Sequence, residues 1–134
     1  MNKMVTDLKL AKNTGSAHEG AGHWWHQRFT AILLILLVSW LFAVSYDILM
    51  GESNLDMILS SPMHSGMAIM FVIVMFYHAS LGMQVVIEDY VSNLCIRRAL
   101  IVAMQIASIV TAFAAIFTIY SVFIASFITS MLLS

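Results

Sequence analysis

Apolar residues fill three long stretches of this 134-residue chain, and short polar segments separate them. The stretches run over about 29–50, 63–87 and 99–132. A helix needs roughly 20 apolar residues to cross the hydrocarbon core of a bilayer, and each stretch is long enough. The third is longer than a bilayer requires, so we expect it to tilt or to leave the hydrocarbon at one end. The pattern predicts an all-α integral membrane protein with three transmembrane helices.

The remaining segments are polar and fit the ends and connections of such helices. Residues 1–22 are predicted to form a polar tail, and two tryptophans beside a basic residue follow in the sequence His23-Trp24-Trp25-His26-Gln27-Arg28. Indole rings favour the headgroup level of a membrane, so this segment is typical of an interfacial anchor. The segments 51–62 and 88–98 are predicted to connect the three helices. We predict a single membrane-anchor domain over 1–134.

The basic residues predict the orientation of the helices in the membrane. All six lysines and arginines precede Phe29 or lie in 88–98, whereas the 51–62 loop has acidic residues and no basic ones. Basic segments stay on the cytoplasmic or matrix side, so we expect the N-terminus inside and the C-terminus outside. Arg28, Asp89 and Tyr90 should then share one level near the inner face, with His78 about three turns deeper.

Charge and cysteine content exclude several classes of function. Only 10% of the residues are charged and the net charge is −1, with no basic patch of the kind that binds nucleic acid. Cys95 is the single cysteine, so the chain cannot form an internal disulfide or hold an iron–sulfur cluster. It also has no glycine-rich dinucleotide motif. Any redox chemistry beyond one bound group must therefore come from other chains.

Small residues recur along one face of the third stretch. They follow a 4-3-4-3-4 spacing at Ala107, Thr111, Ala114, Thr118, Ser121 and Ala125. Small side chains let helices approach closely in lipid, so this face predicts a closely packed neighbouring helix.

His78 lies inside the second apolar stretch and shares a helical face with Gly82, Val85 and Asp89. An imidazole in hydrocarbon needs a partner, which can be a hydrogen bond to another helix, a proton relay or a metal ion. Gly82 favours the metal, because a flat macrocycle lying on a helix needs a missing side chain nearby. His64 lies about 21 Å away along the helix, so either a partner chain supplies a second axial histidine or there is no haem with two histidine ligands.

Asp89 and Tyr90 follow directly after the second stretch, and the carboxylate lies about 16 Å from His78 along the helix. One interpretation is a solvated helix end with an aromatic residue at the interface. The other is a polar pocket for a lipid-soluble quinone. In that pocket the tyrosine hydroxyl donates to a carbonyl oxygen, and an Asp–Arg pair with Arg28 orients it and passes protons.

Two motifs resemble those of the small hydrophobic membrane-anchor subunits of succinate dehydrogenase, the D subunits of respiratory complex II. The first is His78-x-x-x-Gly82 followed, after six residues, by Asp89-Tyr90-Val91. The second is His23-Trp24-x-x-x-Arg28, with Thr30-Ala31 opening the first span.

The resemblance implies roles for five residues. His78 becomes an axial ligand of haem b, shared with a histidine of a large membrane anchor, the cytochrome b subunit, and Gly82 packs against the haem. Tyr90 hydrogen-bonds ubiquinone with Asp89 beside it. Arg28 lies near the haem propionates or the quinone pocket.

The resemblance also implies partners and a location. The chain would pack with the second anchor in the bacterial inner membrane, or in the mitochondrial inner membrane if organelle-encoded. It would carry no catalytic head of its own, and a flavoprotein subunit and an iron–sulfur subunit would deliver electrons from succinate. The alternatives are the anchor of a fumarate reductase, a haem-free structural anchor, and a small transporter with His78 as proton relay.

Overall fold

The computed structural model describes residues 16–132, which are almost entirely helical. Three long helices, α2 (Ser16–Leu49), α4 (Pro62–Tyr90) and α5 (Leu94–Leu132), are joined by short connections, the first of which contains the short helix α3 (Leu55–Leu59). Residues 1–15, most of the predicted polar tail, lie outside the described residues. The described chain contains no β-strand, which confirms the predicted all-α class.

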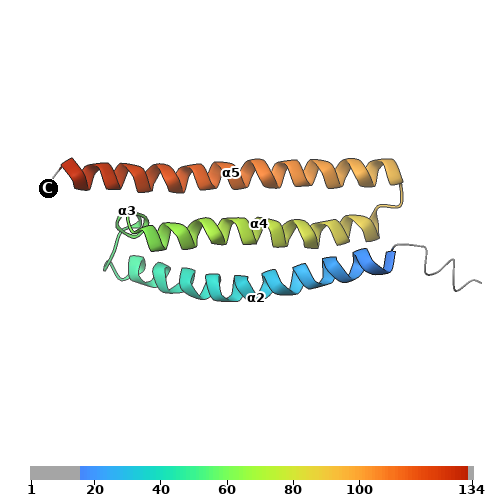
Figure 1. Ribbon diagram of the computed structural model, residues 1–134, viewed down its shortest axis with the longest axis horizontal. Coiled ribbons are helices and arrows are strands. Elements are labelled where there is room, and N and C mark those ends of the chain that lie inside the picture. The colour runs from blue at the N-terminus through green and yellow to red at the C-terminus, as the bar shows by residue number, and fades with distance from the viewer. Residues whose placement is uncertain (1–15, 133–134) are drawn as a thin grey trace, which may run out of the picture.

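The three long helices run antiparallel and side by side, with α4 in the middle (Figure 1). Helix α4 packs against both α2 and α5, and the short helix α3 contacts both α4 and α5. Segments long and apolar enough to cross a membrane occupy Gly22–Leu49, Pro62–Tyr90 and Leu94–Thr129. The prediction of three candidate transmembrane helices is therefore confirmed.

Local sequence explains where the helices begin and end. Gly51 has a φ of 76° and can turn the chain after α2 without steric cost. Pro62 stands in the first turn of α4, where its missing N–H is not needed. The side chain of Asn93 accepts hydrogen bonds from the backbone N–H groups of Cys95 and Ile96, at 3.0 and 3.3 Å. This cap starts α5 at Leu94, five residues before the apolar stretch begins.

The helices are longer than the apolar stretches, because a helix need not stop at the membrane surface. Helix α2 begins at Ser16, inside the predicted tail, well before the apolar residues. Helix α5 has 39 residues and is about 58 Å long. Its C-terminal end extends past the ends of α2 and α4 (Figure 1), as expected for a helix longer than a bilayer needs.

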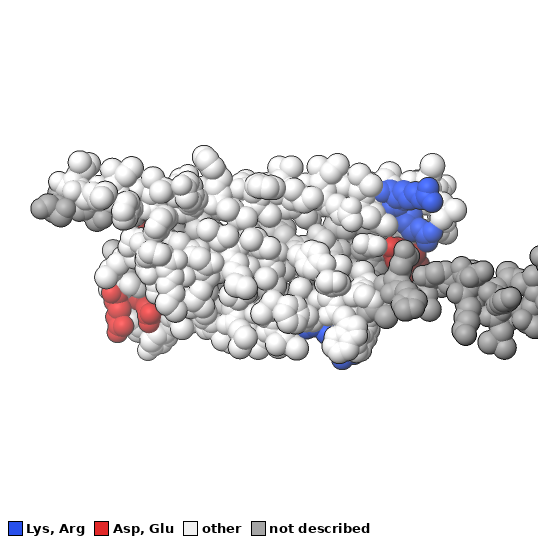
Figure 2. Space-filling view, viewed as in Figure 1, with Lys and Arg blue, Asp and Glu red and all other residues white. Residues whose placement is uncertain are grey.

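The interior of this single layer of helices is small. The buried apolar side chains are Leu37, Val44, Ile58, Leu59, Val72 and Val74, and most large apolar side chains are exposed. Figure 2 shows uncharged surface along the length of the molecule, with charged groups gathered mainly towards the two ends. Such a surface suits lipid and partner helices rather than water.

Helix α5 turns the residues of its small-residue seam away from α2 and α4. The seam residues Ala107, Thr111, Ala114, Thr118, Ser121 and Ala125 are all exposed. The residues of α5 that face α4 lie on another side, at Ser108, Ala112 and Ile116. The close helix contact that the seam predicts is thus not made with α2 or α4.

A hydrogen bond between Trp40 and His64 ties α2 to α4 far from His78. The indole Nε1–H donates to Nδ1 of the imidazole at 3.1 Å, and the two rings are stacked with centroids 6.0 Å apart. This histidine therefore has a partner within the chain.

Replacing Trp40 by phenylalanine should lower stability by about 1 kcal/mol, because the N–H donor is lost while a smaller aromatic ring remains. Thermal unfolding of the purified protein in detergent measures the change. Trp25→Phe is the control, since the Trp25 side chain is 66% exposed. Equal effects of the two substitutions would contradict a contribution from the Trp40–His64 bond.

Candidate functional site

His78 of α4 is held by a threonine from the facing helix α2. Its Nδ1 lies 2.8 Å from the hydroxyl oxygen of Thr30, which is 48 residues away in sequence. Thr30 is 6% exposed, and its Oγ1 also lies 2.8 Å from the carbonyl oxygen of His26. No hydrogen bond from residues 22–132 reaches the other ring nitrogen, Nε2. One nitrogen of this imidazole is thus fixed, and the other is open to a ligand.

Gly82 lies one turn further along α4 and also faces α2. A Cβ atom there would be 3.6 Å from Nε2 of Gln27, which is an ordinary van der Waals distance. Packing inside this chain therefore does not demand a glycine at this position. The space beside Gly82 borders a flexible amide side chain that can move if another group needs the room.

The contacts between α2 and α4 show that Arg28 does not lie at the level of Asp89. Thr30 is level with His78, and Gln27 is level with Gly82. Arg28 lies between these two α2 residues, whereas Asp89 is at least seven residues further along α4, which is about 10 Å. The expectation that Arg28 shares a level with Asp89 and Tyr90 is wrong, since the backbone of Arg28 lies near the depth of His78.

The guanidinium of Arg28 reaches back towards the N-terminal end of α2. It lies over the ring of Trp24, 4.1 Å from the centroid. A cation over an indole face is stabilised by the ring quadrupole, and the long side chain can extend towards water. This contact holds the charged group beside Trp24, about one turn closer to the N-terminal end of α2 than the backbone of Arg28.

Asp89 and Tyr90 form the exposed C-terminal end of α4. Tyr90 is 86% exposed, and its hydroxyl makes no hydrogen bond with the described part of the chain. The backbone leaves the helix at Val91, which has an extended conformation. Arg97 and Arg98 at the start of α5 stand at this same end, where Figure 2 shows basic and acidic side chains together. We call it the basic end of the bundle.

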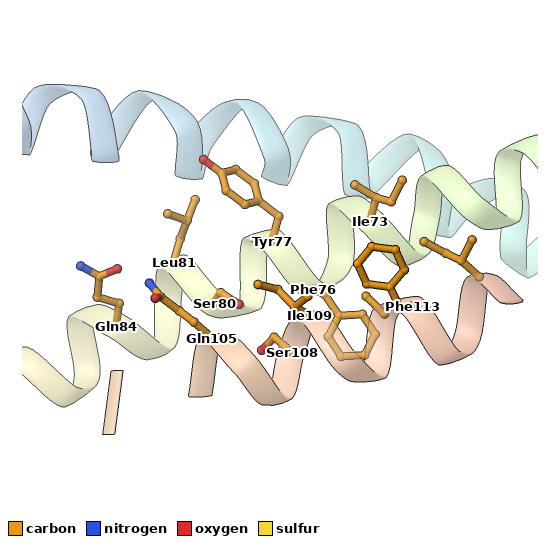
Figure 3. Close-up of a pocket in the computed structure, with 12 residues that line it drawn as sticks. Ile73, Phe76, Tyr77, Ser80, Leu81, Gln84, Gln105, Ser108, Ile109 and Phe113 are labelled. Atoms are coloured by element: carbon orange, nitrogen blue, oxygen red, sulfur yellow. The ribbon is translucent and has the colours of Figure 1, made fainter. Parts of the chain in front are cut away.

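A groove of about 510 Å³ lies between α4 and α5, away from the contact of His78 with α2. It is mostly apolar, but four polar side chains line it, from Ser80, Gln84, Gln105 and Ser108 (Figure 3). None of the five predicted site residues lines this groove. A quinone pocket formed by Asp89 and Tyr90 would therefore need walls from another chain.

The described residues contain no group of three or more histidine, cysteine, aspartate or glutamate side chains placed to bind a metal ion. His78 alone can offer one nitrogen. A metal ion bound to its Nε2 would need its remaining ligands from outside this group of residues.

Thr30 and Gln27 are the site residues that sequence reasoning did not assign a role. Thr30 stands out in the sequence only as a hydroxyl residue at the start of an apolar stretch. Its helix position does not reveal that it faces His78, because that depends on how the 51–61 connection aligns α2 with α4.

Comparison with known proteins adds a family. The family described as the succinate dehydrogenase/fumarate reductase transmembrane subunit matches residues 2–133. A succinate dehydrogenase hydrophobic membrane anchor subunit of Rickettsia bellii is 42% identical over 117 residues, covering 85% of this chain and 92% of the relative. The corresponding protein of Rickettsia conorii is 40% identical, covering 81% and 90%. One from Paracoccus denitrificans is 30% identical, covering 66% and 69%. No solved structure matches the chain significantly.

These matches extend over nearly the whole chain, well beyond the two motifs that carry the resemblance, and they confirm it. They also imply that other succinate dehydrogenase subunits accompany this one. Together with the three spanning helices, they show that the chain belongs to the succinate dehydrogenase/fumarate reductase transmembrane subunit family, as a multi-pass hydrophobic membrane anchor subunit of succinate dehydrogenase in respiratory complex II.

Proposed function

We propose that this anchor supplies one axial ligand of haem b through His78 and one side of a ubiquinone-reducing site through Tyr90 and Asp89. The main support is the hydrogen bonding of His78. Its Nδ1 is hydrogen-bonded to Thr30, and no described residue forms a hydrogen bond with its Nε2. A histidine that only bridged two helices would not need its second nitrogen free.

The residues present fit a haem. His78 lies on a spanning helix with one nitrogen oriented by another helix, which is the usual environment of a metal-binding imidazole. Gly82 leaves room one turn away, and Arg28, whose backbone lies near the depth of His78, carries a positive charge that would pair with a propionate. When bound, haem b supplies a one-electron redox centre inside the membrane. The depth of Arg28 favours the propionate role over the quinone pocket.

Ubiquinone reduction would take place at the basic end of the bundle. The Tyr90 hydroxyl donates a hydrogen bond to a quinone carbonyl oxygen, which stabilises negative charge as electrons arrive. The Asp89 carboxylate beside it passes protons from water to the reduced oxygens. Two electrons from the iron–sulfur subunit and two protons convert the quinone to the quinol.

The site needs a partner anchor. Tyr90 is almost fully exposed, and three helices in one layer do not enclose a cavity around His78 or Asp89. The large anchor subunit would provide the second axial histidine and the remaining wall of the quinone pocket. Its helices would cover part of the apolar surface that α2, α4 and α5 leave open. The basic end faces the cytoplasm or matrix in this proposal, with the C-terminus on the other side.

Affinity purification through this chain tests the proposal directly. We expect mass spectrometry to identify a second anchor, an iron–sulfur protein and a flavoprotein, and the purified complex to show a low-spin haem b spectrum and to reduce ubiquinone with succinate. The chain produced without its partners should bind no stoichiometric low-spin haem. Such a haem in the isolated chain would contradict ligation shared between two subunits.

A further inference from the structure

We propose that Thr30 is a positioning residue for His78: its hydroxyl oxygen accepts a hydrogen bond from Nδ1–H, and so fixes the imidazole tautomer whose Nε2 can bind iron. This inference rests on the proposed haem function and adds a residue on the opposite helix to it.

The hydroxyl of Thr30 lies among three possible hydrogen-bond partners. Its Oγ1 is 2.8 Å from Nδ1 of His78, 2.8 Å from the carbonyl oxygen of His26 and 3.1 Å from that of Gln27. The side chain is buried between α2 and α4, so water does not compete for these contacts. Which of these groups donates in each hydrogen bond follows from the single proton that the hydroxyl carries.

A hydroxyl has one proton to donate, and a carbonyl oxygen can only accept. When the proton of Thr30 goes to a carbonyl of its own helix, Oγ1 is left as an acceptor for the imidazole. Nδ1 of His78 must then carry the ring proton and donate it. A neutral imidazole has only one N–H, so Nε2 keeps its lone pair. The resulting chain of bonds runs from Nδ1–H to Oγ1–H to the carbonyl of His26, and each bond strengthens the next.

The second histidine of α4 shows the opposite arrangement. Trp40 can only donate, and it donates to Nδ1 of His64. The proton of a neutral His64 ring is therefore on Nε2, which leaves no lone pair for a metal. The partners supplied by α2 thus select different tautomers for the two histidines, and only the one facing Thr30 is ready to act as a ligand.

The bond to Thr30 should also tune the bound iron. A hydrogen bond accepted from the far nitrogen of a metal-bound imidazole orients the ring and raises its basicity. A more basic ligand favours the oxidised metal. Loss of the acceptor should therefore shift the midpoint potential of the haem to a more positive value and weaken haem retention.

The test compares three variants in the whole complex. Thr30→Val keeps the shape of the side chain and removes the acceptor, and Thr30→Ser restores a hydroxyl. Thr129→Val is the matched control, because Thr129 is an exposed threonine of α5 outside the seam, and its hydroxyl donates to the carbonyl of Ala125 at 2.9 Å. The measurements are haem per flavin after purification and the midpoint potential from a redox titration of the haem absorbance.

We expect Thr30→Val to bind haem about 10- to 100-fold more weakly and to show a positive shift in midpoint potential. Thr30→Ser and Thr129→Val should match the wild type in both measurements. A Thr30→Val complex with wild-type retention and potential would overturn the inference. If valine prevents assembly, Thr30→Ala takes its place, since alanine is smaller than threonine. Failure of both to assemble would indicate a purely structural role and would also overturn it.

A different experimental result would contradict the proposed function of His78. A wild-type complex without haem, or one whose haem survives His78→Ala, would remove the ligand role of His78 itself. Unchanged haem properties in Thr30→Val, with haem lost in His78→Ala, would remove only the role of Thr30.

Discussion

Replacing His78 by alanine is expected to abolish haem b binding in the assembled complex. The imidazole lies within a spanning helix, and its Nε2 is free of hydrogen bonds from the described residues. Loss of groups that merely support a metal ligand costs 10- to 100-fold in affinity, so loss of the ligand itself should lower haem content by at least about tenfold. The measurement is the absorption spectrum of the purified complex, normalised to flavin.

His64→Ala is the matched control for this substitution. His64 is also on α4, but it is engaged by Trp40, so its removal should leave the haem spectrum unchanged. A normal haem band in His78→Ala, or equal losses in the two variants, would show that His78 is not the ligand.

Replacing Tyr90 by phenylalanine should lower succinate–ubiquinone turnover by about 100-fold. The change removes one hydrogen-bond donor from the place where negative charge develops on the quinone oxygen, and such donors typically contribute 100- to 1,000-fold. Succinate oxidation with a water-soluble electron acceptor should be unaffected, because that reaction does not use the membrane site. Steady-state rates with the two acceptors separate the quinone step from the rest of the enzyme.

Tyr120→Phe provides the comparison for Tyr90. Tyr120 is on α5, is 55% exposed and lies in the half of that helix away from the basic end. Its replacement should not change either rate. Wild-type ubiquinone turnover in Tyr90→Phe would remove the hydroxyl from the proposed mechanism.

The fold could be predicted from sequence because lipid imposes a simple requirement. A spanning helix satisfies its own backbone hydrogen bonds, so the length of an apolar stretch nearly determines the element. The ends of the helices were less predictable, since they depend on local caps. The side chain of Asn93 starts α5 at Leu94, and α2 begins at Ser16, where composition alone indicates a polar tail.

The site was only partly predictable, because its geometry depends on the alignment of two helices. His78 and Gly82 share a face by helical periodicity, and the structure keeps both of them towards α2. The depth of Arg28 was predicted wrongly, because a charged residue before an apolar stretch was taken to mark the membrane boundary. Helix α2 instead continues past it, and the side chain turns back over Trp24. Periodicity within one helix contains no information about which residue of its neighbour lies opposite.

The contact of Thr30 with His78 bears on the order of events during biogenesis. The two residues are 48 positions apart and belong to different helices, so the ring is oriented only after α2 and α4 have been inserted and have closed into a hairpin. Capture of the cofactor should therefore follow translation of both segments. Helix α5 makes no part of this contact, so a nascent chain that ends at Tyr90 would already present the imidazole in its final tautomer.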